Sequence, residues 1–159
     1  MPTPQRNDAD LILAADVDLD IKAGKDPLDD VAKVKITAYT GDLISVYGWD
    51  AVVIDLAGLS AGEQIPLCVD HNTRLDGIVG YGACRNDGKK LYVEGQISLV
   101  NDAAKRIVAL SKSGLKFQAS VGVRPTETEW IAVGKSVTVN GRAVKSDREF
   151  KLVKRGLLR

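Results

Sequence analysis

The stretch IVGYGACRNDGKKLYVEGQISL, residues 78–99, decides the fold class of this chain. In Leu91–Leu99 apolar and polar residues alternate, which is the period of a half-buried β-strand. The tripeptide at 86–88, Asn-Asp-Gly, has the composition of a tight turn. The stretch therefore predicts two antiparallel strands, Ile78–Ala83 and Leu91–Leu99, joined by that turn.

Strand patterns continue outward from this hairpin on both sides. Residues 1–10 have the polar composition of a disordered leader, and Gly24 to Asp30 have that of a turn or linker. Short apolar or alternating runs predict further strands at Leu11–Ile21, from Val31 to Ala38, and at Ala51–Leu56, Ile65–Val69, Phe117–Val123, Thr126–Val133, Ser136–Val139 and Phe150–Leu158.

One segment, NDAAKRIVALSKSG at residues 101–114, breaks the strand pattern and predicts a helix. Asn101 is a good N-cap, and Gly114 can adopt the left-handed conformation that ends a helix. We therefore expect a single mainly β domain over residues 11–159, a closed or nearly closed β-barrel with inserted helical structure. The helix face that we expect to be buried holds Ala103, Ile107 and Leu110.

Composition excludes several functional classes. The chain has 159 residues, and its net charge of +1 argues against a general nucleic-acid binder or an electrostatic membrane-surface protein. No apolar run is long enough to span a bilayer. The two cysteines, Cys68 and Cys84, lie in apolar stretches, so we expect reduced core thiols in a cytosolic protein.

The sequence contains a single histidine, His71, at the point where a predicted strand passes into a polar loop. A lone histidine is more often structural than functional, by roughly four to one. Cys68, Asp70 and Asp76 are nearby, but there is no second histidine and no closely spaced cysteine pair. Because zinc sites need three or four ligands, we expect no metal and no cofactor here.

Ser120 is the serine of greatest interest, because it sits between the small residues Ala119 and Gly122 on an otherwise apolar strand. Small neighbours leave room for a substrate carbonyl. A core serine that bonds a neighbouring carbonyl explains the pattern equally well. Nucleophilic catalysis needs a base within reach, and His71 is the histidine available for that role.

Three segments together resemble the tailed-phage prohead (capsid-maturation) serine proteases. Residues 65–98, IPLCVDHNTRLDGIVGYGACRNDGKKLYVEGQIS, resemble the family's histidine block. Residues 101–123, NDAAKRIVALSKSGLKFQASVGV, look like its helix and the Ser-Val-Gly strand that presents the nucleophile. Residues 38–59, AYTGDLISVYGWDAVVIDLAGL, resemble an N-terminal strand pair of a subgroup. The ordered combination is more specific than any one motif.

The resemblance implies a β-barrel similar to that of the herpesvirus assembly proteases, with His71 as general base and Ser120 as nucleophile. The implied reaction is peptide-bond hydrolysis through an acyl-enzyme. Its substrates would be the phage scaffold and major capsid proteins inside the immature head in the host cytoplasm, with self-cleavage as a further reaction. Proteases of this fold often associate, so a homo-oligomer is also implied.

In this family an acidic residue of the last barrel strand orients the histidine. The resemblance implies that this residue follows Arg159; Asp147 and Glu149 are weaker substitutes. Two other interpretations stay open. One is a non-enzymatic phage head assembly or scaffold domain that keeps the barrel, and the other is an unrelated β-domain that binds a ligand.

Overall fold

The structure, a computed structural model, describes residues 10–22, 31–46, 48–99 and 101–158. The predicted leader, apart from Asp10, and the predicted turn at 24–30 therefore lie outside the described residues. The described elements are β1 (Leu11–Lys22), β2 (Val31–Tyr39), β3 (Ile44–Val46), β4 (Asp50–Ile54), β5 (Leu59–Ser60), β6 (Ile65–Cys68), β7 (Ile78–Asn86), β8 (Leu91–Ile97), α1 (Asp102–Lys112), β9 (Gln118–Ile131), β10 (Ser136–Val139), β11 (Arg142–Lys145) and β12 (Phe150–Leu158).

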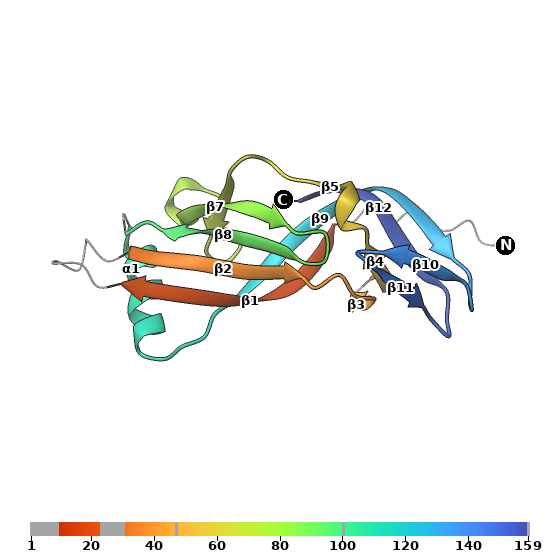
Figure 1. The fold of residues 1–159 in the computed structure, drawn as a ribbon. Helices are drawn as coiled ribbons and strands as arrows, with labels where there is room; N and C mark the ends of the chain where they lie inside the picture. The colour runs from red at the N-terminus through yellow and green to blue at the C-terminus, as the bar shows by residue number, and fades with distance from the viewer. Residues whose placement is uncertain (1–9, 23–30, 47, 100, 159) are drawn as a thin grey trace.

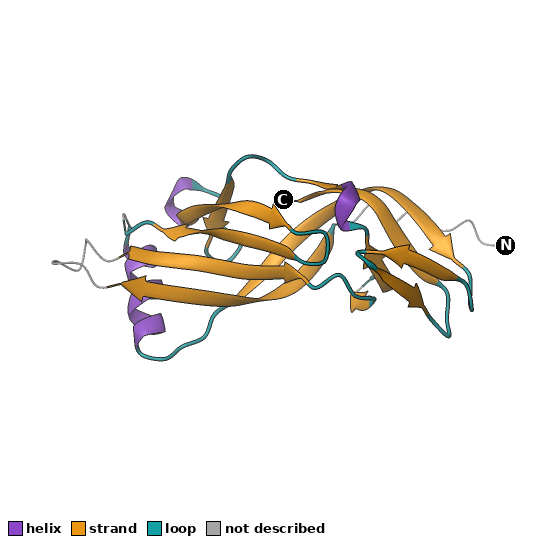
Figure 2. Ribbon diagram, viewed as in Figure 1, coloured by secondary structure: helices purple, strands orange, loops and turns teal. Residues whose placement is uncertain are grey.

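The prediction of a mainly β domain is confirmed (Figure 2). Ten strands form one sheet in the order β3-β4-β12-β9-β1-β2-β8-β7-β6, with β5 alongside β12, and β10 and β11 form a separate hairpin. The sheet curls into a half-barrel. Its end strands, β3 and β6, do not pair with each other in the described structure, so the expected closure of the barrel is not complete.

Strand alternation builds the main hydrophobic core. In β1, Leu11, Leu13 and Ala15 are buried while the residues between them are exposed. β1 pairs antiparallel with β2 on one side and with β9 on the other, so these side chains share the inner face of the curl with Val34, Val121 and Val123. The expected hairpin of β7 and β8 is confirmed, and it extends the same face.

Helix α1 begins and ends as its caps predict. The Asn101 side chain accepts a hydrogen bond from the N–H of Ala104 at 2.8 Å, and Gly114 has a φ of +106°. The buried face is different from the expected one, because Ala104 and Val108 are buried while Leu110 is exposed. The helix is rotated so that this pair faces the sheet, and Ala103 and Ile107 form its half-buried flank.

The expectation of two strands at 117–123 and 126–133 is wrong, because β9 is one continuous strand of 14 residues. Pro125 lies in its middle, opposite Gly156 of β12. β1 pairs with β9 only up to Val123, so at Pro125 one edge of β9 has no partner among the described strands. A proline is tolerated at such an edge, since no ladder hydrogen bond is lost there.

A second core lies at the other end of the molecule, where β4, β10, β11 and β12 meet the distal half of β9 (Figure 1). Phe150 is fully buried at its centre, and Ile131, Val139 and Val144 pack around it. β9 and β12 run side by side and contribute to both cores. This pairing joins the half-barrel to the smaller lobe.

Candidate functional site

His71 lies in a tight turn that follows β6. The N–H of Asn72 donates to the carbonyl of Val69 at 2.8 Å, and the two central residues, Asp70 and His71, have φ values of 51° and 58°. A hydrogen-bonded turn with positive φ at both central positions is of type I′. Positive φ costs about 1–2 kcal/mol for a residue with a Cβ, so His71 is held in a costly conformation.

The loop around His71 is fixed by its own hydrogen bonds. The Asn72 side chain accepts from the N–H of Arg74 at 3.0 Å, and the N–H of Val69 donates to the carbonyl of Gly77 at 2.9 Å. Gly77 is needed at this position, because a Cβ there would lie 2.2 Å from the carbonyl oxygen of Asn72. His71 itself is exposed, and its imidazole makes no hydrogen bond within the described part of the chain.

Ser120 lies on β9, directly opposite Ala14 of β1. Its side chain is exposed and makes no hydrogen bond to the residues that the structure describes, so it is not a core serine that bonds a neighbouring carbonyl. Along its other edge β9 has no described partner at residues 118–122, because the pairing with β12 begins at Val123. Ser120 is therefore approachable both from outside the sheet and from its free edge.

His71 and Ser120, 49 residues apart in sequence, line the same cavity. Its volume is about 680 Å³, within the range of roughly 300–1,000 Å³ typical of ligand pockets. The cavity is bounded by β6 and the turn after it on one side and by residues 117–122 on the other. The sequence-predicted pair thus borders one space, although no hydrogen bond joins the two side chains in the described structure.

Among the described residues, the acidic ones that border this cavity are Asp10 and Asp70. Asp10 forms an ion pair with Arg124 at 3.2 Å. Asp147 and Glu149 do not line the cavity. Glu149 precedes β12, and the residue of β12 that lines the cavity is Leu158, at the far end of the strand. Roughly 25 Å of strand therefore separates Glu149 from the cavity.

The cavity offers no evident metal site. Among the described residues, no group of three or more histidine, cysteine, aspartate or glutamate side chains could hold a metal ion. Cys68 lines the cavity and Cys84 does not, and both are free and half-buried. They are therefore less buried than the core thiols that the sequence predicts.

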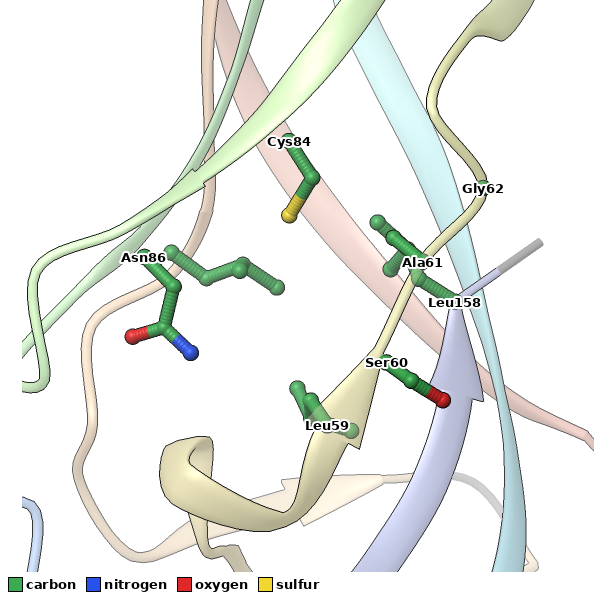
Figure 3. A pocket seen from close by; sticks show the side chains of 8 residues that line it. Leu59, Ser60, Ala61, Gly62, Cys84, Asn86 and Leu158 are labelled. Atoms are coloured by element: carbon green, nitrogen blue, oxygen red, sulfur yellow. The ribbon is translucent and has the colours of Figure 1, made fainter.

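A smaller cavity of about 210 Å³ lies between β7 and the segment 59–62 (Figure 3). Cys84 and Asn86 face it from β7, and Leu158 borders both cavities. Burial raises the pKa of the Cys84 thiol. A raised pKa favours the protonated thiol, which is a poor nucleophile.

Comparisons of this chain with protein-family models, curated proteins and solved structures found no significant match. No helix in the described ranges is long and apolar enough to cross a membrane.

Proposed function

We propose that this chain is a serine endopeptidase of the prohead-protease type, with Ser120 as nucleophile and His71 as general base. The observation that carries the proposal is the shared cavity of about 680 Å³, which both side chains border although they come from distant parts of the sequence. Both polar groups are exposed and without partners in the described structure, so both are available for chemistry.

In this mechanism His71 takes the proton of the Ser120 hydroxyl as the oxygen attacks a peptide carbonyl. The imidazolium then gives that proton to the leaving amine, and an acyl-enzyme remains on Ser120. Water, activated by the same imidazole, releases the acyl group. The mechanism requires a hydrogen bond between the two side chains to form on substrate binding, since catalytic hydrogen bonds often form only in that complex.

The orienting acid is proposed to come from a strand beside the free edge of β9. Residues 118–122 have no described partner on that side, and a strand pairing there would run next to Ser120. The resemblance to prohead proteases implies an acidic residue on the last strand of the barrel. An acid in this position would hold the His71 tautomer and stabilise the imidazolium.

The proposed role is cleavage of scaffold and major capsid proteins during maturation of a tailed-phage head, with self-cleavage as a further reaction. This role rests on the resemblance of residues 38–59, 65–98 and 101–123 to that family. The alternative is a phage head scaffold domain that keeps the fold without activity. One observation favours this alternative: in the described structure no hydrogen bond joins His71 and Ser120.

Labelling with a fluorophosphonate separates the two functions. We expect the wild-type chain to be labelled on Ser120, and we expect Ser120→Ala to abolish the label. His71→Ala should slow labelling by at least about 100-fold, because the general base contributes roughly 10²–10⁴-fold. Intact-mass spectrometry and peptide mapping measure the extent and position of the label.

Ser136→Ala is the matched control, because Ser136 is an exposed serine on β10 that does not line the cavity. It should be labelled at the wild-type rate. Absence of Ser120-dependent labelling rejects the enzyme and leaves the scaffold function.

A further inference from the structure

We infer that the cavity beside Ser120 is a specificity pocket for a bulky aliphatic side chain, on the residue that supplies the acyl group of the cleaved bond. This inference rests on the proposed peptidase function and adds the class of substrate. It is carried by the chemistry of the cavity walls, by their charge and by the small residues that flank Ser120.

The walls of the cavity are aliphatic. Its floor is the inner face of the half-barrel, where β1, β2, β7, β8 and β9 each contribute side chains that belong to the main core. Ile107 of α1, together with Ile65 and Leu67 of β6, lines the sides. Such walls favour an apolar group, since transfer of each buried methylene from water is favourable. The floor residues are Val17, Leu19, Val34, Ile36, Val79, Ile97 and Val121.

The charge of the cavity excludes acidic side chains. Among the residues that the structure describes, no lysine or arginine lines it, and the carboxylates that do are Asp10 and Asp70. Arg124 neutralises Asp10, whereas Asp70 has no hydrogen-bond or ion-pair partner among the described residues. The remaining negative charge stands next to His71. A glutamate or aspartate side chain entering here would lose water and meet a like charge.

The cavity reaches Ser120 around the free edge of β9: Ser120 is on the exposed face of the strand, Ala119 and Val121 are on its core-facing side, and all three line the cavity. Ala119 is half-buried, packs against the main core and lines the cavity, and Gly122 has no side chain at all. A peptide whose carbonyl lies at Ser120 would therefore direct its adjoining side chain around this edge, past Ala119, into the cavity. Its volume of about 680 Å³ is sufficient for a branched aliphatic side chain.

The test uses peptidyl diphenyl phosphonates that differ only in the side chain beside phosphorus, which is that of leucine, alanine or glutamate. The rate of Ser120 labelling is measured by intact-mass spectrometry. We expect the leucine probe to react at least about tenfold faster than the alanine probe, because three more carbons are buried. The glutamate probe should be the slowest.

A pair of variants locates the preference. Ala119→Phe obstructs the path around the free edge of β9, so it should lower the leucine-to-alanine rate ratio toward one. Ala83→Phe makes the same change on an exposed position of β7 that does not line the cavity, and it should leave the ratio unchanged. A general loss of activity slows both probes equally, so it does not change their rate ratio.

Equal rates for the three side chains in the wild-type chain overturn this inference, provided that a simple fluorophosphonate still labels Ser120. The same holds if glutamate is preferred. If the simple fluorophosphonate fails to label Ser120, the proposed peptidase function has failed instead. The wild-type series decides the matter even if Ala119→Phe does not fold.

Discussion

Two tight turns with the same backbone conformation have opposite surroundings. In the turn between β10 and β11, Asn140 and Gly141 have φ values of 54° and 75°; in the turn after β6, Asp70 and His71 have 51° and 58°. The first pair is the preferred sequence for a type I′ turn, because asparagine and glycine adopt positive φ at low cost. The second pair contains no glycine.

The Asn140 side chain is buried and fully engaged. Its amide donates to the carbonyls of Gly41 and Ile54 at 3.1 and 2.8 Å, and its oxygen accepts from the N–H of Leu56 at 2.9 Å. These bonds tie the β10–β11 hairpin to the segment around β4, between the two cores. The turn is therefore a structural joint, and its residue types follow from that role.

The side chain of His71 is exposed and makes no hydrogen bond in the described structure, although its backbone conformation is equally restricted. Nothing in the local packing requires a histidine. A residue kept in a costly conformation without structural contacts is expected at functional sites, where strain is tolerated for the sake of positioning. Two turns of one type therefore differ in role: the turn at Asn140 stabilises the fold, whereas the turn at His71 exposes a side chain.

The largest effect is expected for Asn140→Ala. Removing the side chain leaves the buried N–H of Leu56 and two carbonyls without their partner, and alanine keeps the cost of positive φ. We expect a loss of about 3–5 kcal/mol in the free energy of unfolding, measured by urea denaturation. Asn140→Gly should lose about 1 kcal/mol less, because glycine relieves the backbone cost.

Asn72→Ala gives the matched control in the other turn. In an exposed loop, the Asn72 side chain accepts from the N–H of Arg74 at 3.0 Å and donates weakly to the Asp76 carboxylate at 3.4 Å. Its loss should cost less than about 1 kcal/mol. Equal destabilisation by Asn72→Ala and Asn140→Ala would contradict the division into a structural and a presenting turn.

An intermediate change in stability with pH is expected from Tyr39, which lies beside Asn140. The Tyr39 hydroxyl accepts from the N–H of Ile54 at 3.1 Å and donates to the carbonyl of Asp42. Burial raises the pKa of Tyr39 from 10.0 to about 12. Between these values the unfolded chain releases the phenol proton and the folded chain retains it. The folded state therefore loses stability as the pH rises through this window.

The expected loss is about 2–3 kcal/mol between pH 9 and pH 12, since each pKa unit corresponds to about 1.4 kcal/mol. Urea unfolding at both pH values measures it. Tyr39→Phe should lack this part of the decline, while Tyr81→Phe, at an exposed tyrosine, should decline as the wild type does. Parallel declines in all three chains would show that Tyr39 does not titrate in this window.

Local patterns were sufficient to predict most strands and the helix ends. The alternation in β1 and β8 and the caps at Asn101 and Gly114 are properties of a few neighbouring residues, and the structure confirms them. The continuity of β9 through Pro125 could not be predicted this way. It depends on β1 beginning opposite Val123, which is a property of the sheet and not of the strand.

The candidate site was predictable in its residues but not in its setting. His71 and Ser120 were singled out from a lone histidine, a serine among small residues and a family resemblance. Their shared cavity arises from the curl of the whole sheet, which no local pattern encodes. The turn at His71 gave no signal either, because Val-Asp-His-Asn lacks the glycine that usually marks a type I′ turn.

The smallest expected change in stability is the difference between His71→Gly and His71→Ala. It bears most directly on the comparison of the two turns. Glycine relieves the cost of φ = 58°, whereas alanine keeps it, so the glycine variant should be about 1 kcal/mol more stable than the alanine variant. Urea unfolding measures this difference, and fluorophosphonate labelling should be slowed to a similar extent in both. A gain in stability that accompanies the loss of labelling would mean that the histidine is kept for its chemistry at a cost to the fold. If alanine is as stable as glycine, the turn is not strained at His71, and the contrast with Asn140 reduces to hydrogen bonding alone.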